Sequence, residues 1–373
     1  MIATGQLKRS WRGSGDGTAK DRSRAGRISL TALAALCLAG LTGPAAAAAV
    51  QQPAGVLFAW GNDDNGQVGG GSGNFDATPV HLTLPAGTAV TAVAAGFYSS
   101  LALTSDGRVL AWGSDYDGQL GVGGGNRGSD PTPSPVELPA GTDVTAIASG
   151  YFHCLALTSD GRVLAWGDDS RGEIGDGSTT DITHPVSVPV PVDLPAGTRV
   201  TAVAGGGNLS LALTADGRVL AWGDNSVGQL GNGTTADSSL PVPVNLPPGT
   251  DVTAIAAGDD FSLAVTSDGR VFAWGGDYRA NDYLPTRVDL PAGTRVTSVA
   301  AGFGGALAVT SGGRVLELGS GPFGGSPVAG LPACVRITGV SINGLHILAV
   351  GVQAPATETG ARDPAAGRTG HPI

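Results

Sequence analysis

The stretch VTAIASGYFHCLALTSDGRVLAWGDDSRGEIG, residues 144–175, recurs along most of this chain and decides its fold. Its clearest mark is a tryptophan that returns every 52 to 56 residues, at Trp60, Trp112, Trp166, Trp222 and Trp274. A sixth, degraded copy is GRVLELG at 313–319, and ITGVSIN at 337–343 begins a last, diverged one. Self-similarity at a period of this size indicates a repeat architecture.

Each copy predicts four short β-strands. Within the quoted stretch, VTAIASG, CLALT and GRVLAWG are rich in Val, Leu, Ile and Thr and are separated by turn residues. Asp160-Gly161 between the second and third segments predicts a two-residue hairpin turn. A Pro-Val phrase follows, as at Pro185-Val186. Because proline cannot donate to an inner ladder, this fourth strand is expected at the sheet edge.

The order of the segments predicts how the repeats assemble. A lone four-stranded sheet exposes two apolar faces, and radial stacking of several sheets buries them. The pattern begins with a third strand at Val56–Gly61 and ends with a first and a second at Ile337–Val350. We therefore expect an all-β fold, a β-propeller over 50–352 with six countable units, seven being possible, closed by pairing of the N- and C-terminal strands. Residues 353–373 show no strand pattern and are expected to be a disordered tail.

Residues 1–49 differ from the rest and predict a signal peptide. A basic region is followed by an apolar run at 28–41 and an alanine series at 45–49. The run is short for a membrane span, so a secreted, extracellular protein is expected, with an anchor as the alternative. The cleavage position stays open.

Removal of residues 1–49 leaves 14 arginines, no lysine and 29 acidic residues, a net charge of −15. Nucleic-acid binders need clustered cations to neutralise phosphates, and anionic membranes attract basic segments. The composition therefore argues against both as partners. Of the two remaining cysteines, Cys154 is expected to be a small packed residue, and its pairing with Cys334 is left open.

Four of the tryptophans open a longer phrase: WGNDDNGQVG (60–69), WGSDYDGQLG (112–121), WGDDSRGEIG (166–175) and WGDNSVGQLG (222–231). With the Pro-Val phrases and GYFHC at 150–154, residues 56–350 resemble the regulator-of-chromosome-condensation repeat family. The fifth and sixth units depart from it, since GDYRANDYLP and SGPFGGSP follow there. Export makes the chain similar to secreted bacterial members, among them a β-lactamase-inhibitor protein that binds its enzyme across one propeller face.

The turn after the first strand varies while its flanks stay constant, which is how loops on a scaffold carry recognition. The resemblance implies that aromatic residues in these turns contact a partner, and aromatic rings are enriched at interface hot spots. The alternative is that some rings plug the space between blades. The candidate binding residues are Phe97, Tyr98, Tyr151, Phe152, Asp259, Asp260 and Phe303.

The other candidates for chemistry have simpler interpretations. His153 and His346 are expected to bond neighbouring turns, and the tryptophans to pack between sheets. The oxygen-rich loops, such as Asp115-Tyr116-Asp117, could hold calcium but are also ordinary turn formers. The motifs of phosphate, zinc and serine-hydrolase sites are missing, so neither cofactor nor metal is expected.

These features predict a secreted, monomeric, non-catalytic module that binds a protein partner, such as an exported or cell-wall enzyme. Two alternatives stay open. One is a propeller that acts on or binds glycans, which for hydrolysis would need two converging carboxylates. The other is a structural surface protein.

Overall fold

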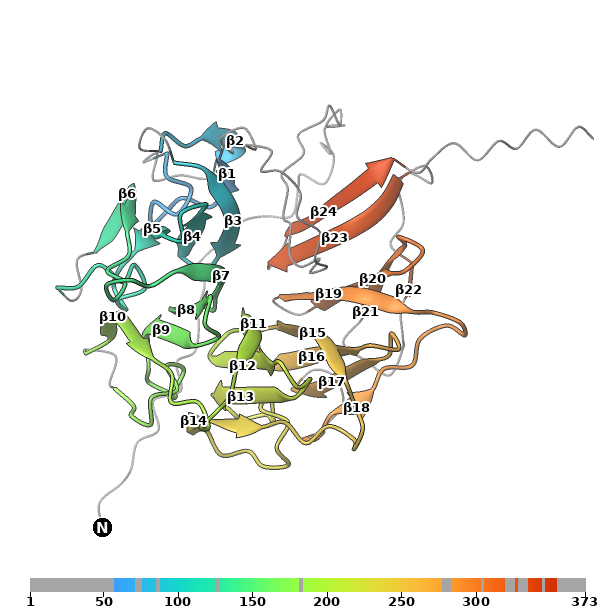
Figure 1. Cartoon of the computed structure of the whole chain (residues 1–373). Coiled ribbons are helices and arrows are strands. Elements are labelled where there is room, and N and C mark those ends of the chain that lie inside the picture. Colours follow the sequence, from blue (N-terminus) through green and yellow to red (C-terminus); the bar gives the residue numbers. More distant parts are fainter. Residues whose placement is uncertain are drawn as a thin grey trace, which may run out of the picture. The chain divides into compact units, whose positions relative to one another are not determined.

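The computed structural model describes residues 57–70, 76–84, 88–124, 128–180, 184–276, 283–302, 305–318, 326–327, 335–343 and 346–353. The expected signal peptide and nearly all of the expected tail lie outside these ranges, as do Phe303 and Cys334. The ordered elements of these ranges are β-strands (Figure 1). No helix there is long and apolar enough to cross a membrane.

Five antiparallel four-stranded sheets make up most of the described chain. Their strands are β3 (Val90–Ala95), β4 (Ser99–Thr104), β5 (Val109–Ser114) and β6 (Ser129–Pro135); β7 (Val144–Ser149), β8 (His153–Thr158), β9 (Val163–Gly167) and β10 (Val186–Pro191); β11 (Val200–Gly205), β12 (Leu209–Thr214), β13 (Val219–Gly223) and β14 (Ser238–Pro243); β15 (Val252–Ala257), β16 (Phe261–Thr266), β17 (Val271–Gly275) and β18 (Thr286–Arg287); β19 (Val296–Gly302), β20 (Gly305–Thr310), β21 (Val315–Leu318) and β22 (Ser326–Pro327).

Each sheet is a meander in chain order, and the strand that follows the tryptophan strand lies at the edge. The prolines predicted this position correctly. The Asp-Gly hairpins are one residue longer than the expected two-residue turn. In the first of them, the Gly107 amide donates to the Thr104 carbonyl at 3.0 Å. The Thr104 amide donates to the Arg108 carbonyl at 2.9 Å. Gly107 has a φ of +77°, so this is a turn followed by a glycine bulge, which also matches strand twist.

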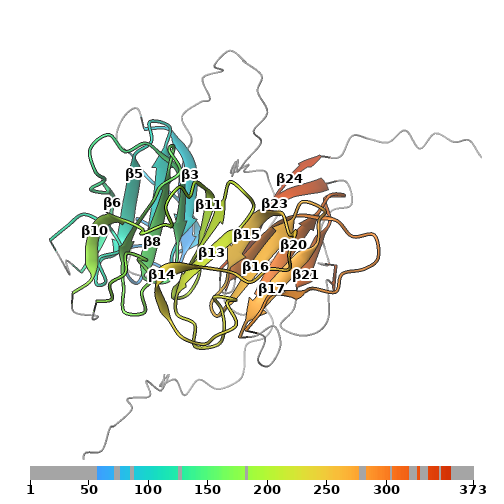
Figure 2. The same ribbon diagram turned by 60° about the horizontal axis from the view of Figure 1, so that its bottom comes forward.

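Successive sheets pack face to face along their first strands. β7 contacts β3 and β4, β11 contacts β7 and β8, β15 contacts β11 and β12, and β19 contacts β15 and β16. Figure 1 and Figure 2 both show the sheets following one another in chain order. Each apolar cluster draws on two neighbouring sheets, as where Leu101 and Leu103 pack with Ala156 and Trp166. This is the stacking of a β-propeller.

A repeated pair of hydrogen bonds fastens four of the five full sheets to the sheet before them, the exception being β19–β22, where Leu318 replaces the tryptophan. The indole Nε1 of Trp222 donates to the backbone carbonyl of Glu173 at 2.8 Å, and the Ser210 hydroxyl donates to the same oxygen at 3.0 Å. Equivalent indole bonds of 2.9–3.0 Å hold the other three buried tryptophans, Trp112, Trp166 and Trp274. All four are at most 2% exposed. The expectation that the repeat tryptophans pack between sheets is confirmed for these four, whereas Trp60 is 41% exposed.

The ends of the repeat region form two further, two-stranded sheets. One joins β1 (Phe58–Gly61) to β2 (Asp76–His81), and the other joins β23 (Val335–Asn343) to β24 (His346–Gln353). Within the described ranges β24 does not pair with β1, so the expected closing sheet is present as two separate halves. Counted together with the five full sheets, the halves give six units.

A candidate binding face

The two ends of the sheets carry different loops. We call one end the turn face: it bears the connections between first and second strands, residues 96–98, 150–152, 206–208 and 258–260. The loops after the third strands start at the same end, since the amide of Ser114 donates to the carbonyl of Tyr98 at 2.8 Å and that of Asp168 to Phe152 at 2.9 Å. We call the opposite end, with its Asp-Gly loops, the hairpin face.

Neighbouring turns of the turn face are bonded directly to one another. The Tyr151 amide donates to the Gly207 carbonyl at 3.0 Å, and the Gly207 amide donates to the Gly258 carbonyl at 3.0 Å. A Cβ atom on Gly96 would lie 3.0 Å from the Gly150 carbonyl oxygen, so the turns are close enough to favour glycine. Backbone contacts thus fix the positions of the variable side chains relative to one another.

Four of the predicted binding residues form one aromatic cluster, defined as Phe97, Tyr98, Tyr151 and Phe152. The Phe97 ring lies 4.6 Å from that of Tyr98, 4.8 Å from that of Tyr151 and 6.4 Å from that of Phe152. Phe152 is 6.1 Å from each tyrosine ring. Phe97 is 44% exposed and the other three rings are half-buried. The cluster is therefore open to solvent on one side and supported on the other.

Asp259 and Asp260 lie in the turn at 258–260. The turn at 206–208, which contains Gly207, lies between it and the turn of Tyr151. A Cβ on Gly207 would stand 2.6 Å from the Asp259 Oδ1, so the missing side chain allows the approach. Burial, followed by the neighbouring Asp259 and Asp260, raises the pKa of the Tyr151 phenol well above its ordinary value. Six of the seven predicted residues thus share this face, and Phe303 lies outside the described residues.

The oxygen-rich loops use their side chains to hold themselves together. Buried Asp115 accepts from the Leu120 amide at 3.1 Å, and Asp169 accepts from the Ile174 amide at 3.1 Å. In the described ranges, no group of three or more His, Cys, Asp or Glu is placed to hold a metal ion. The turn-forming interpretation of these residues is the one that their contacts support.

Two buried acids lie in the loop after β9, and the sequence pointed to only one of them, Asp169. Asp169 and Glu173 are fully buried, and burial is the main cause that raises the pKa of Asp169 to about 6 and that of Glu173 to about 8. Glu173 stands where the other loops carry Gln67, Gln119 and Gln229. That departure from the repeat was visible in the sequence, but its burial was not.

His153 serves structure rather than chemistry. Its Nε2 lies 3.0 Å from the Ser210 hydroxyl, which itself donates to the Glu173 carbonyl. The imidazole therefore donates to Ser210, so it does not act as a base toward that hydroxyl. Burial lowers the pKa of His153 to about 4. The bond goes to Ser210 on strand β12 of the next sheet and not, as expected, to a neighbouring turn, and Cys154 beside His153 is a free, buried thiol.

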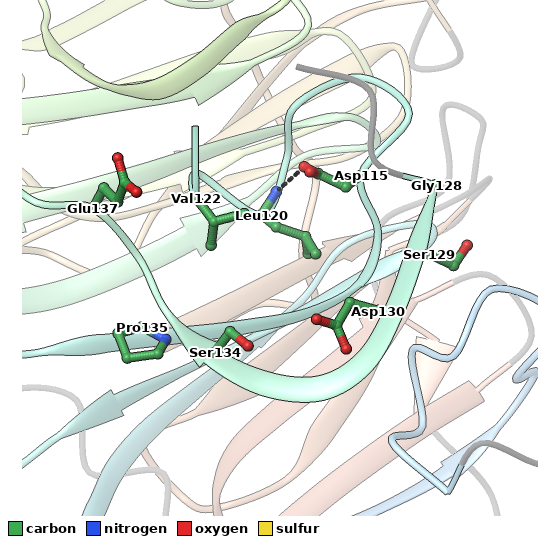
Figure 3. Close-up of a pocket in the computed structure, with 9 residues that line it drawn as sticks. All are labelled: Asp115, Leu120, Val122, Gly128, Ser129, Asp130, Ser134, Pro135 and Glu137. Carbon is green, nitrogen blue, oxygen red and sulfur yellow. Dashed lines mark hydrogen bonds between the residues drawn. The ribbon is translucent and has the colours of Figure 1, made fainter. Parts of the chain in front are cut away.

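A separate pocket of about 380 Å³ lies beside β6 (Figure 3). Asp115, Asp130 and Glu137 are among its lining residues, and Leu120 is held by the bond to Asp115 drawn there. None of the nine lining residues is aromatic. The pocket therefore lacks the ring platform that the turn face provides.

Fold and site together define a class: a β-propeller of four-stranded repeats that presents variable side chains on one end. Comparison with known families specifies it further. The model of the regulator of chromosome condensation (RCC1) repeat matches residues 54–103, 106–157, 160–213 and 216–265. The chain belongs to the RCC1 repeat family. A second model of the same repeat matches residues 90–119, 144–173, 200–229 and 252–280, so the matches end within the fifth unit, where the sequence departs from the pattern.

Solved structures and curated proteins agree with this assignment. Yeast RCC1 (Prp20), solved bound to Kap60, superposes with a TM-score of 0.68 at 25% identity, over 81% of this chain and 77% of that one. Human WBSCR16 gives a TM-score of 0.72 at 24% identity, over 80% and 87%, which shows the fold. The ultraviolet-B receptor UVR8 of Arabidopsis thaliana is 30% identical over 59% of this chain and 49% of its own length. The human E3 ubiquitin-protein ligase HERC2 is 32% identical over 59% of this chain and only 4% of its own length.

Proposed function

We propose that this protein is a non-catalytic module that binds another protein with its turn face. The observation that carries the proposal is the aromatic cluster, in which rings from two successive turns meet and Phe97 remains 44% exposed. Large rigid rings on a fixed scaffold provide contact area at a low cost in conformational entropy. The hydrogen-bonded turns beneath them provide that scaffold.

Relatives support a protein partner in general. Yeast RCC1 has been solved with Kap60, and a second structure of Prp20p from Saccharomyces cerevisiae, 25% identical to this chain, is described with its binding to Gsp1p and histones. The present chain spans about half the length of UVR8 and a small part of HERC2. The whole-protein activities of these relatives are therefore not transferred, and we propose only the use of a propeller for protein binding.

We further propose that the protein works outside the cell as a monomer and that its partner is an exported or cell-wall enzyme. The support is the composition of residues 1–49, typical of a signal peptide, and the net charge of −15 on the remainder, which disfavours nucleic acid and anionic membranes. Fractionation of the source cells, with N-terminal sequencing of the secreted protein, tests this. Intact protein retained in the cytoplasm would refute it.

Closure of the propeller is also proposed, by pairing of β24 with β1. Trp60 on β1 is 41% exposed, whereas its four equivalents in complete sheets are at most 2% exposed. Joining of the two half-sheets would supply the neighbouring sheet that the other tryptophans have. If the ring closes, Trp60→Ala costs nearly as much stability as Trp222→Ala. A negligible cost would indicate that the ring is open.

Affinity capture tests the binding function. The chain from Val50 onward serves as bait in culture supernatant and cell-wall extract, beside Phe97→Ser/Tyr151→Ser and a hairpin-face control, Asp216→Asn/Arg218→Gln. We expect one protein that the unaltered bait and the control retain and that the aromatic variant loses. Equal capture by all three baits would contradict the use of the turn face. Retention of polysaccharide alone would instead favour a glycan-binding propeller.

A further inference from the structure

We propose that the turn face recognises an arginine side chain of its protein partner, with the guanidinium stacked on Phe97 or Tyr151 and paired with Asp259. The inference rests on the proposed binding function and specifies the chemistry of the partner. It assigns one occupant to the surface formed by the aromatic cluster and the Asp259 carboxylate, which we call the ring–carboxylate patch.

The geometry brings the two halves of this patch together. Tyr151 contacts Phe97, with ring centroids 4.8 Å apart, and its own backbone bonds the turn at Gly207. Across Gly207 lies Asp259, close enough that a Cβ on the glycine would stand 2.6 Å from its Oδ1. A flat cation resting on the rings would therefore have a carboxylate within reach of its edge.

The charges around the patch favour a cation. The two aspartates help to raise the pKa of the Tyr151 phenol, so their negative potential reaches the cluster. Asp168 likewise contributes to the raised pKa of Asp117 in the loops of the same face, where burial is the larger cause. The Arg171 guanidinium on this face is already paired with Asp237 at 3.1 Å. The turn face therefore carries an excess of negative charge, which attracts a basic partner and repels an acidic one.

The hairpin face differs, because most of its aspartates are neutralised by neighbouring arginines. There the aspartates are matched by arginines two residues later, with N–O distances of 2.7 Å in Asp106–Arg108, Asp160–Arg162, Asp216–Arg218 and Asp268–Arg270. Asp259 has no arginine two residues later, since Phe261 stands there. The missing local counter-charge is what a partner's arginine would supply.

Arginine fits the patch better than lysine. Its planar guanidinium stacks on an aromatic face while its edge donates two parallel hydrogen bonds to a carboxylate. The ammonium group of lysine is a compact, strongly hydrated charge that satisfies only the second requirement. An arginine-bearing loop is therefore the expected epitope.

Titration with short blocked peptides tests the inference without knowledge of the partner. The chain from Val50 onward is titrated with acetyl-Gly-Arg-Gly-Arg-Gly-amide and with its lysine and glutamate counterparts, while NMR follows the aromatic ring and backbone signals of residues 96–98, 150–152 and 258–260. We expect the arginine peptide to shift these signals and to bind about fivefold more tightly than the lysine peptide. The glutamate peptide should leave them unmoved.

Matched variants separate specific from diffuse attraction. Tyr151→Phe keeps the ring and should retain binding, whereas Phe97→Ala and the isosteric Asp259→Asn should each weaken it about fivefold. Asp216→Asn on the hairpin face should change nothing. An unfolded variant would be recognised by collapse of the strand signals, and Asp259→Asn, which conserves shape, keeps the test valid in that case.

Three results would overturn the inference: no shift at residues 96–98 and 150–152, equal binding of the glutamate peptide, or an equal loss in Asp216→Asn. These outcomes are distinguishable from failure of the proposed function. If affinity capture still depends on Phe97 and Tyr151 while the arginine peptide does not bind, the protein-binding role stands and only the arginine assignment falls.

Discussion

The turn face and the hairpin face are two ends of the same strands, yet their loops differ in kind. At the hairpin face four of the five full sheets use the same arrangement, in which a threonine hydroxyl contacts an aspartate that also pairs with an arginine, as in Thr104, Asp106 and Arg108. At the turn face the corresponding positions change from aromatic to glycine to aspartate. The scaffold is thus repeated throughout, and variety is confined to the end that we assign to binding.

The indole hydrogen bonds between neighbouring sheets support both faces. Loss of one of them should therefore have the largest effect on the unfolding free energy. Trp222→Ala removes a buried indole and its bond to the Glu173 carbonyl, and we expect a loss of about 3–5 kcal/mol in unfolding free energy. Urea unfolding followed by circular dichroism measures it. Trp222→Phe keeps most of the ring and should cost clearly less. Equal, small losses in both variants would mean that the tryptophan does not join the sheets.

Glu173, in the loop after β9, is a buried acid at a position where the other repeats carry glutamine. Its pKa is raised in the folded state to about 8, so folding favours the protonated form. Stability is therefore unaffected below about pH 4.5, falls as the pH rises through the intervening range and levels off above about pH 8. We expect Glu173→Gln to stabilise the protein by about 2 kcal/mol at pH 8 and not at all at pH 4.

Gln119 provides the matched reverse experiment, because it occupies the same place in the preceding loop. It is fully buried, so Gln119→Glu should introduce the penalty that Glu173→Gln removes. Urea unfolding at pH 4 and pH 8 measures both variants. A stabilisation by Glu173→Gln that is the same at both pH values would show that the carboxyl is not buried as described.

Two glycines allow a test of how closely the turns pack, because Gly207 lies in a crowded turn and Gly312 in an open part of a hairpin. Gly207→Ala would place a Cβ 2.6 Å from Asp259 Oδ1 and 2.7 Å from its backbone oxygen, so we expect a loss of about 1–2 kcal/mol. Urea unfolding measures the loss. Gly312→Ala at the hairpin face meets only the Thr310 hydroxyl at 3.9 Å and should be neutral or stabilising. The opposite ranking would contradict the packing of the turns.

The smallest effect is expected at the hairpin face. Arg218 and Asp216 are exposed by 66% and 57%, and exposed ion pairs contribute little. Arg218→Gln should change the unfolding free energy by less than about 0.5 kcal/mol and leave partner capture intact. A large loss of capture in this variant would move the binding surface to the hairpin face.

The sequence predicted the strands, the edge position of the proline segments and the packing of the tryptophans, because each follows from a local pattern that repeats. It did not predict that Phe97 and Phe152 from different sheets would meet, since that depends on how neighbouring sheets stack. The two-residue hairpin was wrong by one residue, because Asp-Gly suits both the short turn and the bulged one. The buried state of Glu173 could not be read from a single substitution in the repeat.

The central claim is that a partner covers the turn face. Hydrogen–deuterium exchange of the complex captured by affinity, compared with the free chain, tests it most directly. The account predicts slower exchange at residues 96–99, 150–153, 206–209 and 258–261 and unchanged exchange at 105–108, 159–162, 215–218 and 267–270. Protection confined to the second group would contradict it.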